Sequence, residues 1–149
     1  MSYKRPESVL VVIYREDFRV LLMRRLDLPT FWQSVTGSLE VGELPIRAAA
    51  RELKEETGID VAMLPSVLED ADVQVRYLLH PEWRHRYAPG TTHNLEHWFY
   101  LRVPVTTEIQ LSATEHLEYV WLDFEHAIRK VSSSSNRDAL ITLQKRLTK

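Results

Sequence analysis

The chain has 149 residues and a formal net charge of −2, so we expect one domain spanning residues 1–149. Hydrophobic residues make up 44% of it, enough for a sizeable core, and the near-neutral charge argues against recruitment by a nucleic-acid polymer or an anionic membrane. Cysteine is absent, which excludes disulfides, thiolate metal sites and a cysteine nucleophile. With no apolar stretch of a secretory signal at the start, we expect a cytoplasmic protein.

The first part of the chain predicts strands. A continuous apolar run at 8–14 is typical of a strand buried on both faces. Residues 15–18 form a polar turn, and 20–23 continue as a second strand. Residues 31–36 then run extended into Gly37.

The next stretch predicts a helix at roughly 44–57. Pro45 suits its first turn, where a missing N–H costs nothing. Gly58 suits the position just past its last turn, where a positive φ is usual. Apolar residues at helical spacing can face a core; they are Ile46, Ala49, Ala50 and Leu53.

The second half predicts further strands and a final helix. Residues 61–68 form a short strand or an irregular link, and alternation at 73–79 favours a strand. A long loop rich in aromatic and basic residues covers 81–90. Two more strands are predicted, at 97–103 and 119–122.

A C-terminal helix presents Leu140, Ile141, Leu143 and Leu147 on one face, with Ser135 or Asn136 as its N-cap. Strands before and after a helix at two places suggest an α/β fold in which a mixed sheet lies between helices.

Three carboxylates share one patch of the first helix. Glu52, Glu55 and Glu56 stand at i, i+3 and i+4, and Arg51 lies four residues before Glu55. Like charges at this spacing repel one another, and a hard dication such as Mg²⁺ or Mn²⁺ offsets that repulsion. The alternative is a solvated charged face with one intrahelical salt bridge. Such a face would require neither the flanking glycines nor the earlier Glu43.

The whole stretch resembles the Nudix box of the Nudix hydrolases, Gly-x5-Glu-x7-Arg-Glu-apolar-x-Glu-Glu-x-Gly-apolar, read from Gly37 to Ile59. The resemblance implies the Nudix fold and hydrolysis of a nucleoside diphosphate linked to another group, with a divalent metal on the box helix. It also implies roles for single residues. By position, the metal ligands are Glu52, Glu55 and Glu56, while Arg51 orients them and Glu43 supports the loop.

A later carboxylate is a candidate fourth ligand or general base. Glu115 lies in a polar stretch just before the last predicted strand, and Nudix enzymes often place such a carboxylate on a loop far from the box. An exposed loop glutamate without a role is the alternative. Glu108 and Glu118 are weaker candidates.

Several other residues are candidates for substrate binding. A polyphosphate needs cations beyond the metal, and Lys4 and Arg25 lie beside predicted strands. Thr36 precedes the first box glycine, and Ser133 offers a hydroxyl. Tyr77, Trp32 and Trp83 could stack a flat ring, although each such side chain is more often core packing.

His93 and His97 do not predict a zinc site. Four residues of a strand span about 13 Å, so one ion could not bridge the two rings.

Outside the box, four stretches are similar to those of bacterial Nudix members that act on dihydroneopterin triphosphate in folate synthesis: 31–38, 84–90, 114–117 and 135–137. The function this implies is a Mg²⁺-dependent pyrophosphohydrolase for a small-molecule triphosphate. A house-cleaning nucleoside triphosphate pyrophosphatase is the enzymatic alternative. A nucleotide sensor would be expected to lose box carboxylates, and an RNA-decapping enzyme would need a basic face or a further domain.

Overall fold

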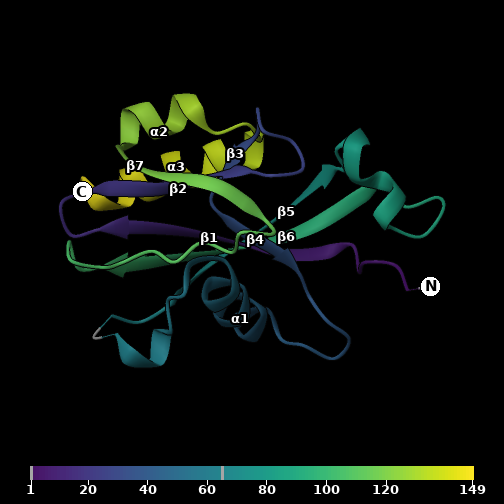
Figure 1. Ribbon diagram of the computed structural model, residues 1–149, viewed down its shortest axis with the longest axis horizontal. Helices are drawn as coiled ribbons and strands as arrows, with labels where there is room; N and C mark the ends of the chain where they lie inside the picture. Colours follow the sequence, from purple (N-terminus) through teal and green to yellow (C-terminus); the bar gives the residue numbers. More distant parts are fainter. Residues whose placement is uncertain (1, 65) are drawn as a thin grey trace.

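The computed structural model describes residues 2–64 and 66–149. In these ranges a mixed sheet lies between helices, with α1 (Pro45–Thr57) on one face and α2 (Phe124–Lys130) and α3 (Ser134–Leu147) on the other (Figure 1). The predicted α/β sandwich is therefore confirmed. None of the described helices is both long and apolar enough to cross a membrane.

The strands of the sheet are β1 (Glu7–Arg15), β2 (Arg19–Arg25), β3 (Trp32–Gln33), β4 (Val35–Ser38), β5 (Glu69–Leu78), β6 (His93–Val103) and β7 (His116–Asp123). Their main order is β3-β2-β1-β6-β5, while β4 pairs with β1 and β7 with β2. β1 runs parallel to β6, with Val9 opposite His97, and the other pairs are antiparallel. This central position explains why β1 reads as a continuous apolar run.

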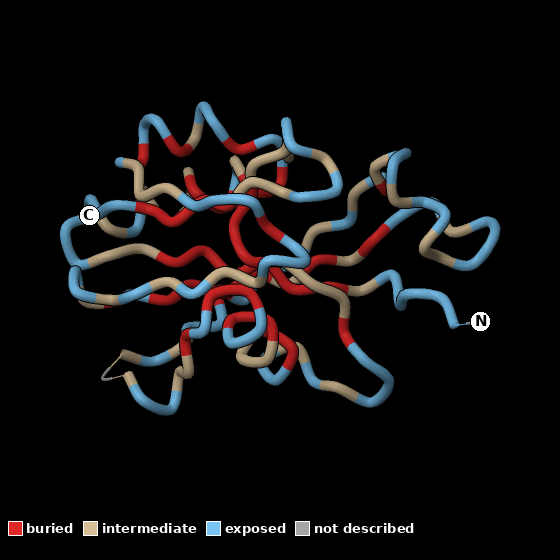
Figure 2. The backbone as a smooth tube through the Cα atoms, in the orientation of Figure 1, coloured by how far each residue is buried: buried red, intermediate tan, exposed pale blue. Residues whose placement is uncertain are grey.

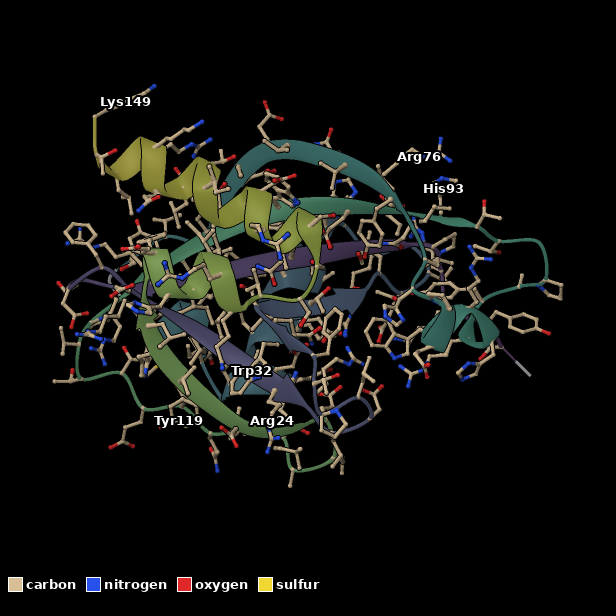
Figure 3. All side chains as sticks on the ribbon, turned by 90° about the horizontal axis from the view of Figure 1, so that it is seen from above. Arg24, Trp32, Arg76, His93, Tyr119 and Lys149 are labelled. Carbon is tan, nitrogen blue, oxygen red and sulfur yellow. The ribbon has the colours of Figure 1, made fainter. Side chains whose placement is uncertain are left out.

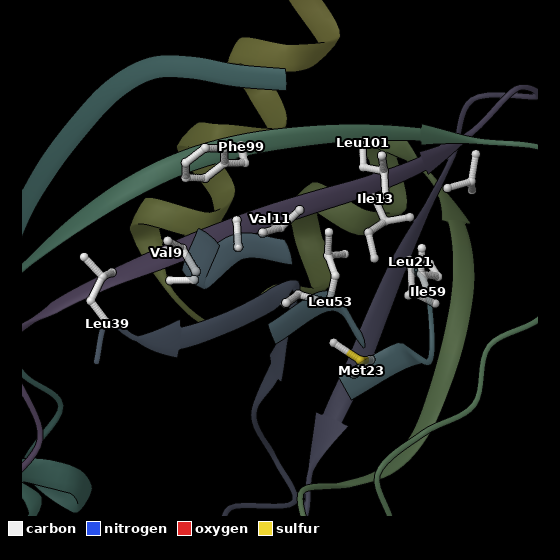
Figure 4. Close-up of a cluster of buried hydrophobic side chains, with 14 residues drawn as sticks. Val9, Val11, Ile13, Leu21, Met23, Leu39, Leu53, Ile59, Phe99 and Leu101 are labelled. Carbon is white, nitrogen blue, oxygen red and sulfur yellow. The ribbon is translucent and has the colours of Figure 1, made fainter. Parts of the chain in front are cut away.

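Alternate residues of β1 supply two separate cores. Val9 and Val11 pack with Leu53 of α1, in the cluster that Figure 4 shows. Leu10 and Val12 point the opposite way and join the cluster that contains Leu140 of α3. Buried residues are accordingly concentrated in the central strands and on the side of α1 that faces them (Figure 2).

Some predicted boundaries of α1 and its core face need correction. The helix begins at Pro45 and ends at Thr57, and Gly58 just beyond it, with a φ of 76°, confirms the predicted cap. Ile46, however, is exposed, and Ala48 is buried in its place. The helical stripe of Ala48, Ala49 and Leu53 is narrower than predicted because carboxylates occupy the adjoining buried positions.

The second half departs further from the prediction. Residues 61–68 contain a 3₁₀ turn, η1 (Val61–Met63), and no strand among the positions described; Pro65 lies outside them. The loop at 81–90 includes a second 3₁₀ segment, η2 (Pro81–Arg86). Both late strands begin earlier than predicted.

Two helix features at the C-terminal end were also wrong or missing in the prediction. The short helix α2 was not predicted; the Asp123 side chain caps it by accepting from the His126 N–H at 2.9 Å. The N-cap of α3 is Ser133 rather than Ser135 or Asn136, because the Ser133 hydroxyl accepts from the Asn136 N–H at 3.0 Å. A run of four serines hides which hydroxyl is the cap.

Candidate active site

Arg51 of α1 ties the box loop to the helix. Its guanidinium donates to both oxygens of Glu43, at 2.9 and 2.8 Å, and to the Glu52 carboxylate at 2.6 Å. Glu43 in turn accepts from the Glu40 N–H at 3.0 Å. Arg51 lowers the pKa of Glu43 to about 2, so Glu43 stays ionised. The contact with Glu55 is longer, at 3.5 Å, so Arg51 braces Glu43 and Glu52 more than the predicted Glu55.

The three box carboxylates are not equivalent. Glu52 and Glu56 are 7% and 2% exposed, whereas the Glu55 side chain is 51% exposed. Burial and the neighbouring Glu52 carboxylate raise the pKa of Glu56. One Glu56 oxygen, Oε1, is buried without a hydrogen-bond partner in the described part of the chain. An unpaired carboxylate oxygen in such a place is costly unless a cation or donor reaches it.

Gly37 of β4 makes room for the box carboxylates. A Cβ at this position would lie 2.1 Å from Cδ of Glu52. Only glycine therefore lets the Glu52 carboxyl group lie flat against the strand. This close approach gives a physical reason for the first glycine of the box.

Glu115 reaches the same site from the turn before β7. Its N–H donates to Ser112 O at 3.1 Å, and its own carbonyl accepts from the Leu26 N–H at 3.0 Å. Its side chain lines a pocket of about 330 Å³ together with Glu52 and Glu56. Burial raises the pKa of Glu115, as do the charges of Glu52 and Glu55. The structure thus brings Glu115 to the box, as predicted.

His116 is a neighbour of this pocket that the sequence did not reveal. It is buried, with Nε2 3.2 Å from the Gln33 amide nitrogen and 3.9 Å from Glu56 Oε1. Burial and the charge of Arg25 lower its pKa to about 4. His116 is therefore neutral at neutral pH and can fill the space beside Glu56 without adding charge. Nothing in the residues around position 116 signals this contact.

The acidic pocket fits a divalent cation. Buried Glu52 and Glu56 offer oxygen donors, and the unpartnered Glu56 oxygen is a free ligand position of the kind that Mg²⁺ accepts. Among the described residues, no three acidic or histidine side chains are already converged on one point as a metal site.

Cations gather where this pocket meets a larger cavity of about 540 Å³. Lys4, Arg25 and Arg86 line both. Burial and the charges of Arg86 and Arg25 lower the pKa of Lys4. Arg25 is held by Asp27 through two contacts of 2.7 Å, with its guanidinium 4.2 Å from the centre of the Trp83 ring. The predicted pair Lys4 and Arg25 thus faces both spaces, and Arg86 is an addition.

The other predicted substrate residues lie around the larger cavity, with one exception. Thr36, Tyr77, Trp83 and Ser133 all line it. Trp32 shows the core packing that is the commoner fate of such a side chain: its ring packs against the α2–α3 core, with the Lys130 ammonium 4.3 Å from its centre.

The two histidines of β6 have separate partners. His97 Nε2 lies 2.6 Å from Glu7 Oε2. His93 is exposed beside Arg76 on the β5–β6 hairpin, with Nδ1 2.8 Å from Thr92 Oγ1 (Figure 3).

A family model described as "NUDIX domain" matches residues 4–143. The chain belongs to the Nudix family. Nudix hydrolases generally use divalent metal ions, which agrees with the acidic pocket formed by the box carboxylates of this Nudix chain.

Relatives cover nearly the whole chain. Dihydroneopterin triphosphate diphosphatase of Escherichia coli is 51% identical over 93% of this chain and 91% of its own length. The Haemophilus influenzae protein of the same name is 40% identical over 94% and 88%. The solved structure of the E. coli dihydroneopterin triphosphate pyrophosphohydrolase superposes with a TM-score of 0.89 at 49% identity, covering 94% of this chain and 95% of that one.

Proposed function

We propose that this Nudix hydrolase converts dihydroneopterin triphosphate to dihydroneopterin monophosphate and pyrophosphate, with Mg²⁺ as its metal. The observation that carries the proposal is the junction of two cavities. An acidic pocket that suits a metal opens, past three cations, into a space large enough for a ring. Relatives named for this reaction match 93% and 94% of the chain.

Glu52 and Glu56 would hold the metal, and Glu55 and Glu115 would be further carboxylate ligands to it. Arg51 is a positioning residue, since it fixes the Glu52 carboxylate at 2.6 Å. When bound, Mg²⁺ supplies Lewis-acid polarisation of the phosphoryl oxygens. Glu55 stays a proposed metal ligand because of its position on the helix next to Glu52 and Glu56, although its side chain is exposed.

Glu115 is the proposed general base. Its raised pKa suits proton transfer, because a base works best when its pKa approaches the working pH. In the reaction, water attacks one phosphorus in line, Glu115 takes the water's proton, and the bond between the α- and β-phosphates breaks. Lys4, Arg25 and Arg86 would offset the charge on the departing pyrophosphate.

The ring end of the substrate would occupy the larger cavity. Tyr77 and Trp83 give aromatic surface there, and Thr36 and Ser133 give hydroxyl groups to its lining. The Thr36 hydroxyl already donates to Val9 O at 2.9 Å, which leaves its oxygen free to accept a hydrogen bond.

A product assay tests the proposal. Dihydroneopterin triphosphate and dATP at equal concentrations compete in one reaction with Mg²⁺, and pyrophosphate is measured against orthophosphate. We expect pyrophosphate as the product and faster loss of the pterin compound. The Glu56→Gln variant, which loses a charge and a ligand, should be inactive even at saturating Mg²⁺.

Release of orthophosphate, or faster loss of dATP, would contradict the proposed substrate or bond. Wild-type turnover by Glu56→Gln would remove Glu56 from the metal site.

A further inference from the structure

The floor of the larger cavity carries a buried carboxylate that the reaction above does not use. Glu96 of β6 lines this cavity and is 3% exposed. Asn94, two residues earlier on the same face of the strand, is 2% exposed and lines it too. Side chains of this kind are rarely buried without a partner or a task.

Neighbouring groups hold the Glu96 and Asn94 side chains in place by hydrogen bonds, but they do not occupy every acceptor position of the two side chains. The Trp98 indole N–H donates to Glu96 Oε1 at 3.0 Å. The Asn94 amide nitrogen donates to Ser8 Oγ at 2.7 Å and to Tyr77 Oη at 3.1 Å. Asn94 Oδ1 is buried with no hydrogen-bond partner among the described residues. A carboxylate offers about four acceptor positions, so with hydrogen bonds from Trp98, Ser135 and Tyr77 Glu96 keeps a position free, and Asn94 Oδ1 adds another.

An excess of buried acceptors selects a ligand edge rich in N–H donors. The pterin ring of dihydroneopterin has such an edge, where the ring N–H and the 2-amino group point the same way. Guanine carries the same pair of donors. Adenine does not, because its ring nitrogen at the matching edge is an acceptor. Two parallel N–H donors match the two oxygens of a carboxylate.

We propose that Glu96 is the specificity-determining residue of the ring cavity, accepting the paired N–H donors of a 2-amino-4-oxopyrimidine edge, with Asn94 Oδ1 as a further acceptor beside it. The inference rests on the proposed function, since it names the group that reads the ring end of that substrate. The inference adds that guanine nucleotides compete with the pterin for the ring cavity, whereas adenine nucleotides do not.

The proposed role needs the ionised form of Glu96. Burial raises its pKa, while hydrogen bonds from Trp98, Ser135 and Tyr77 act in the opposite direction. Two ligand donors would favour the ionised form further. A site with buried acceptors discriminates strongly, because a ring lacking the donors leaves those acceptors unpaired.

The first test compares Glu96→Gln with the wild type on three substrates: dihydroneopterin triphosphate, GTP and ATP. Gln keeps one acceptor for Trp98 but replaces the other oxygen with a donor. We expect kcat/KM to fall about 10- to 100-fold for the first two, the range for losing a hydrogen bond to a charged group, and to stay unchanged for ATP. Glu82→Gln, an exposed change on η2, is the matched control and should leave kcat/KM unchanged for all three substrates.

The second test needs no variant, so it survives a failure of Glu96→Gln to fold. GTP and ITP differ only in the 2-amino group. We expect the wild type to hydrolyse GTP at least about tenfold more efficiently than ITP. Equal efficiency would overturn the proposal.

The third measurement separates this inference from the proposed function. Neopterin, which has no phosphate, is titrated into metal-free protein and followed by its fluorescence. Binding by the wild type that Glu96→Gln weakens supports the ring site even if no dihydroneopterin triphosphate is hydrolysed. If Glu96→Gln lowered kcat/KM equally for all three substrates, Glu96 would have only a structural role. If it lowered none of them, the ring would bind elsewhere.

Discussion

Glu56 shows how a buried box carboxylate can weaken the fold that carries it. Its carboxylate is buried beside Glu52 and near neutral His116, and burial comes first among the causes that raise its pKa. An acid with a raised pKa in the folded state keeps its proton after the unfolded chain, with a pKa near 4.3, has lost it. The free energy of unfolding of metal-free protein therefore falls as pH rises above that value.

This gives a stability prediction for Glu56→Gln in EDTA. The amide carries no titrating proton and can donate to Glu52, so we expect the variant to be more stable than the wild type at pH 8 by about 1 kcal/mol or more, or about 2–4 °C in Tm. The difference should shrink toward pH 4. Thermal unfolding across pH measures it.

The exposed change Glu55→Gln is the control, and its Tm should depend on pH in the same way as the wild-type Tm. A Glu56→Gln protein no more stable than the wild type at pH 8 would show that the Glu56 charge is compensated without metal.

Gly37→Ala tests the close approach to Glu52. The new Cβ would overlap the end of the Glu52 side chain, which can swing away, so the fold should survive with little change in Tm. The displaced carboxylate should raise the half-saturating Mg²⁺ concentration about tenfold or more, as changes beside metal ligands do. A Mg²⁺ titration of activity measures this.

A double variant isolates the cause. If Gly37→Ala acts only through Glu52, it should add no further loss to Glu52→Gln. Full additivity would mean that the methyl group disturbs another part of the site.

At the scale of elements, the site depends on a turn as much as on a helix. α1 brings Glu52 and Glu56 to the acidic pocket, and the turn at 112–115 brings Glu115 to the same pocket. β7 fixes this turn because it pairs with β2, and the Leu26 N–H just after β2 also bonds the Glu115 carbonyl. Glu115, the proposed general base, is thus positioned by strand pairing far from the box.

We expect Glu115→Gln to lower kcat by well over tenfold, within the range of about 10²–10⁴ typical of a general base. Its side chain is exposed enough that Tm should not change. Single-turnover kinetics with a melting curve measures both. Glu118→Gln, which breaks only an exposed contact with Arg24 at 3.0 Å, is the control. If kcat barely moves, the base lies in the box.

At the scale of the molecule, one buried contact links the helix layer to the sheet beside the cavity. Asn136 of α3 accepts from the Ser34 N–H at 2.8 Å and donates to the Ser34 hydroxyl at 3.0 Å, across 102 positions of sequence. This contact fixes the start of α3, and with it Ser133 and Ser135, against the strands that carry Thr36 and Gly37.

Asn136→Ala should therefore destabilise the whole protein by about 1–3 kcal/mol, the cost of leaving buried polar groups of Ser34 without partners. Urea unfolding should show a lower midpoint with an unchanged slope. Asp138→Ala, an exposed change on the same helix, should leave the midpoint where it is. An equal fall in the midpoint for both variants would mean that the loss is not specific to the link with Ser34.

Much of the fold and the acidic half of the site could be predicted from local pattern. The box helix, its glycine cap and the spacing of Glu52 and Glu56 depend on neighbours within a few turns. The doubly buried β1 could be recognised because burial on both faces leaves a continuous apolar run. Glu115 was predicted from a resemblance, and its stretch of sequence carries no signal of its own.

Only the tertiary structure decided which side chains meet. Glu96 lies in a strand whose pattern does not say that its inner face opens into a cavity. His116 meets Gln33 and Glu56 through strand pairing. The sequence by itself determined the chemistry of the box, since those contacts are local. The ring end depends on contacts between distant segments, whose geometry arises only when sheet and helices pack together.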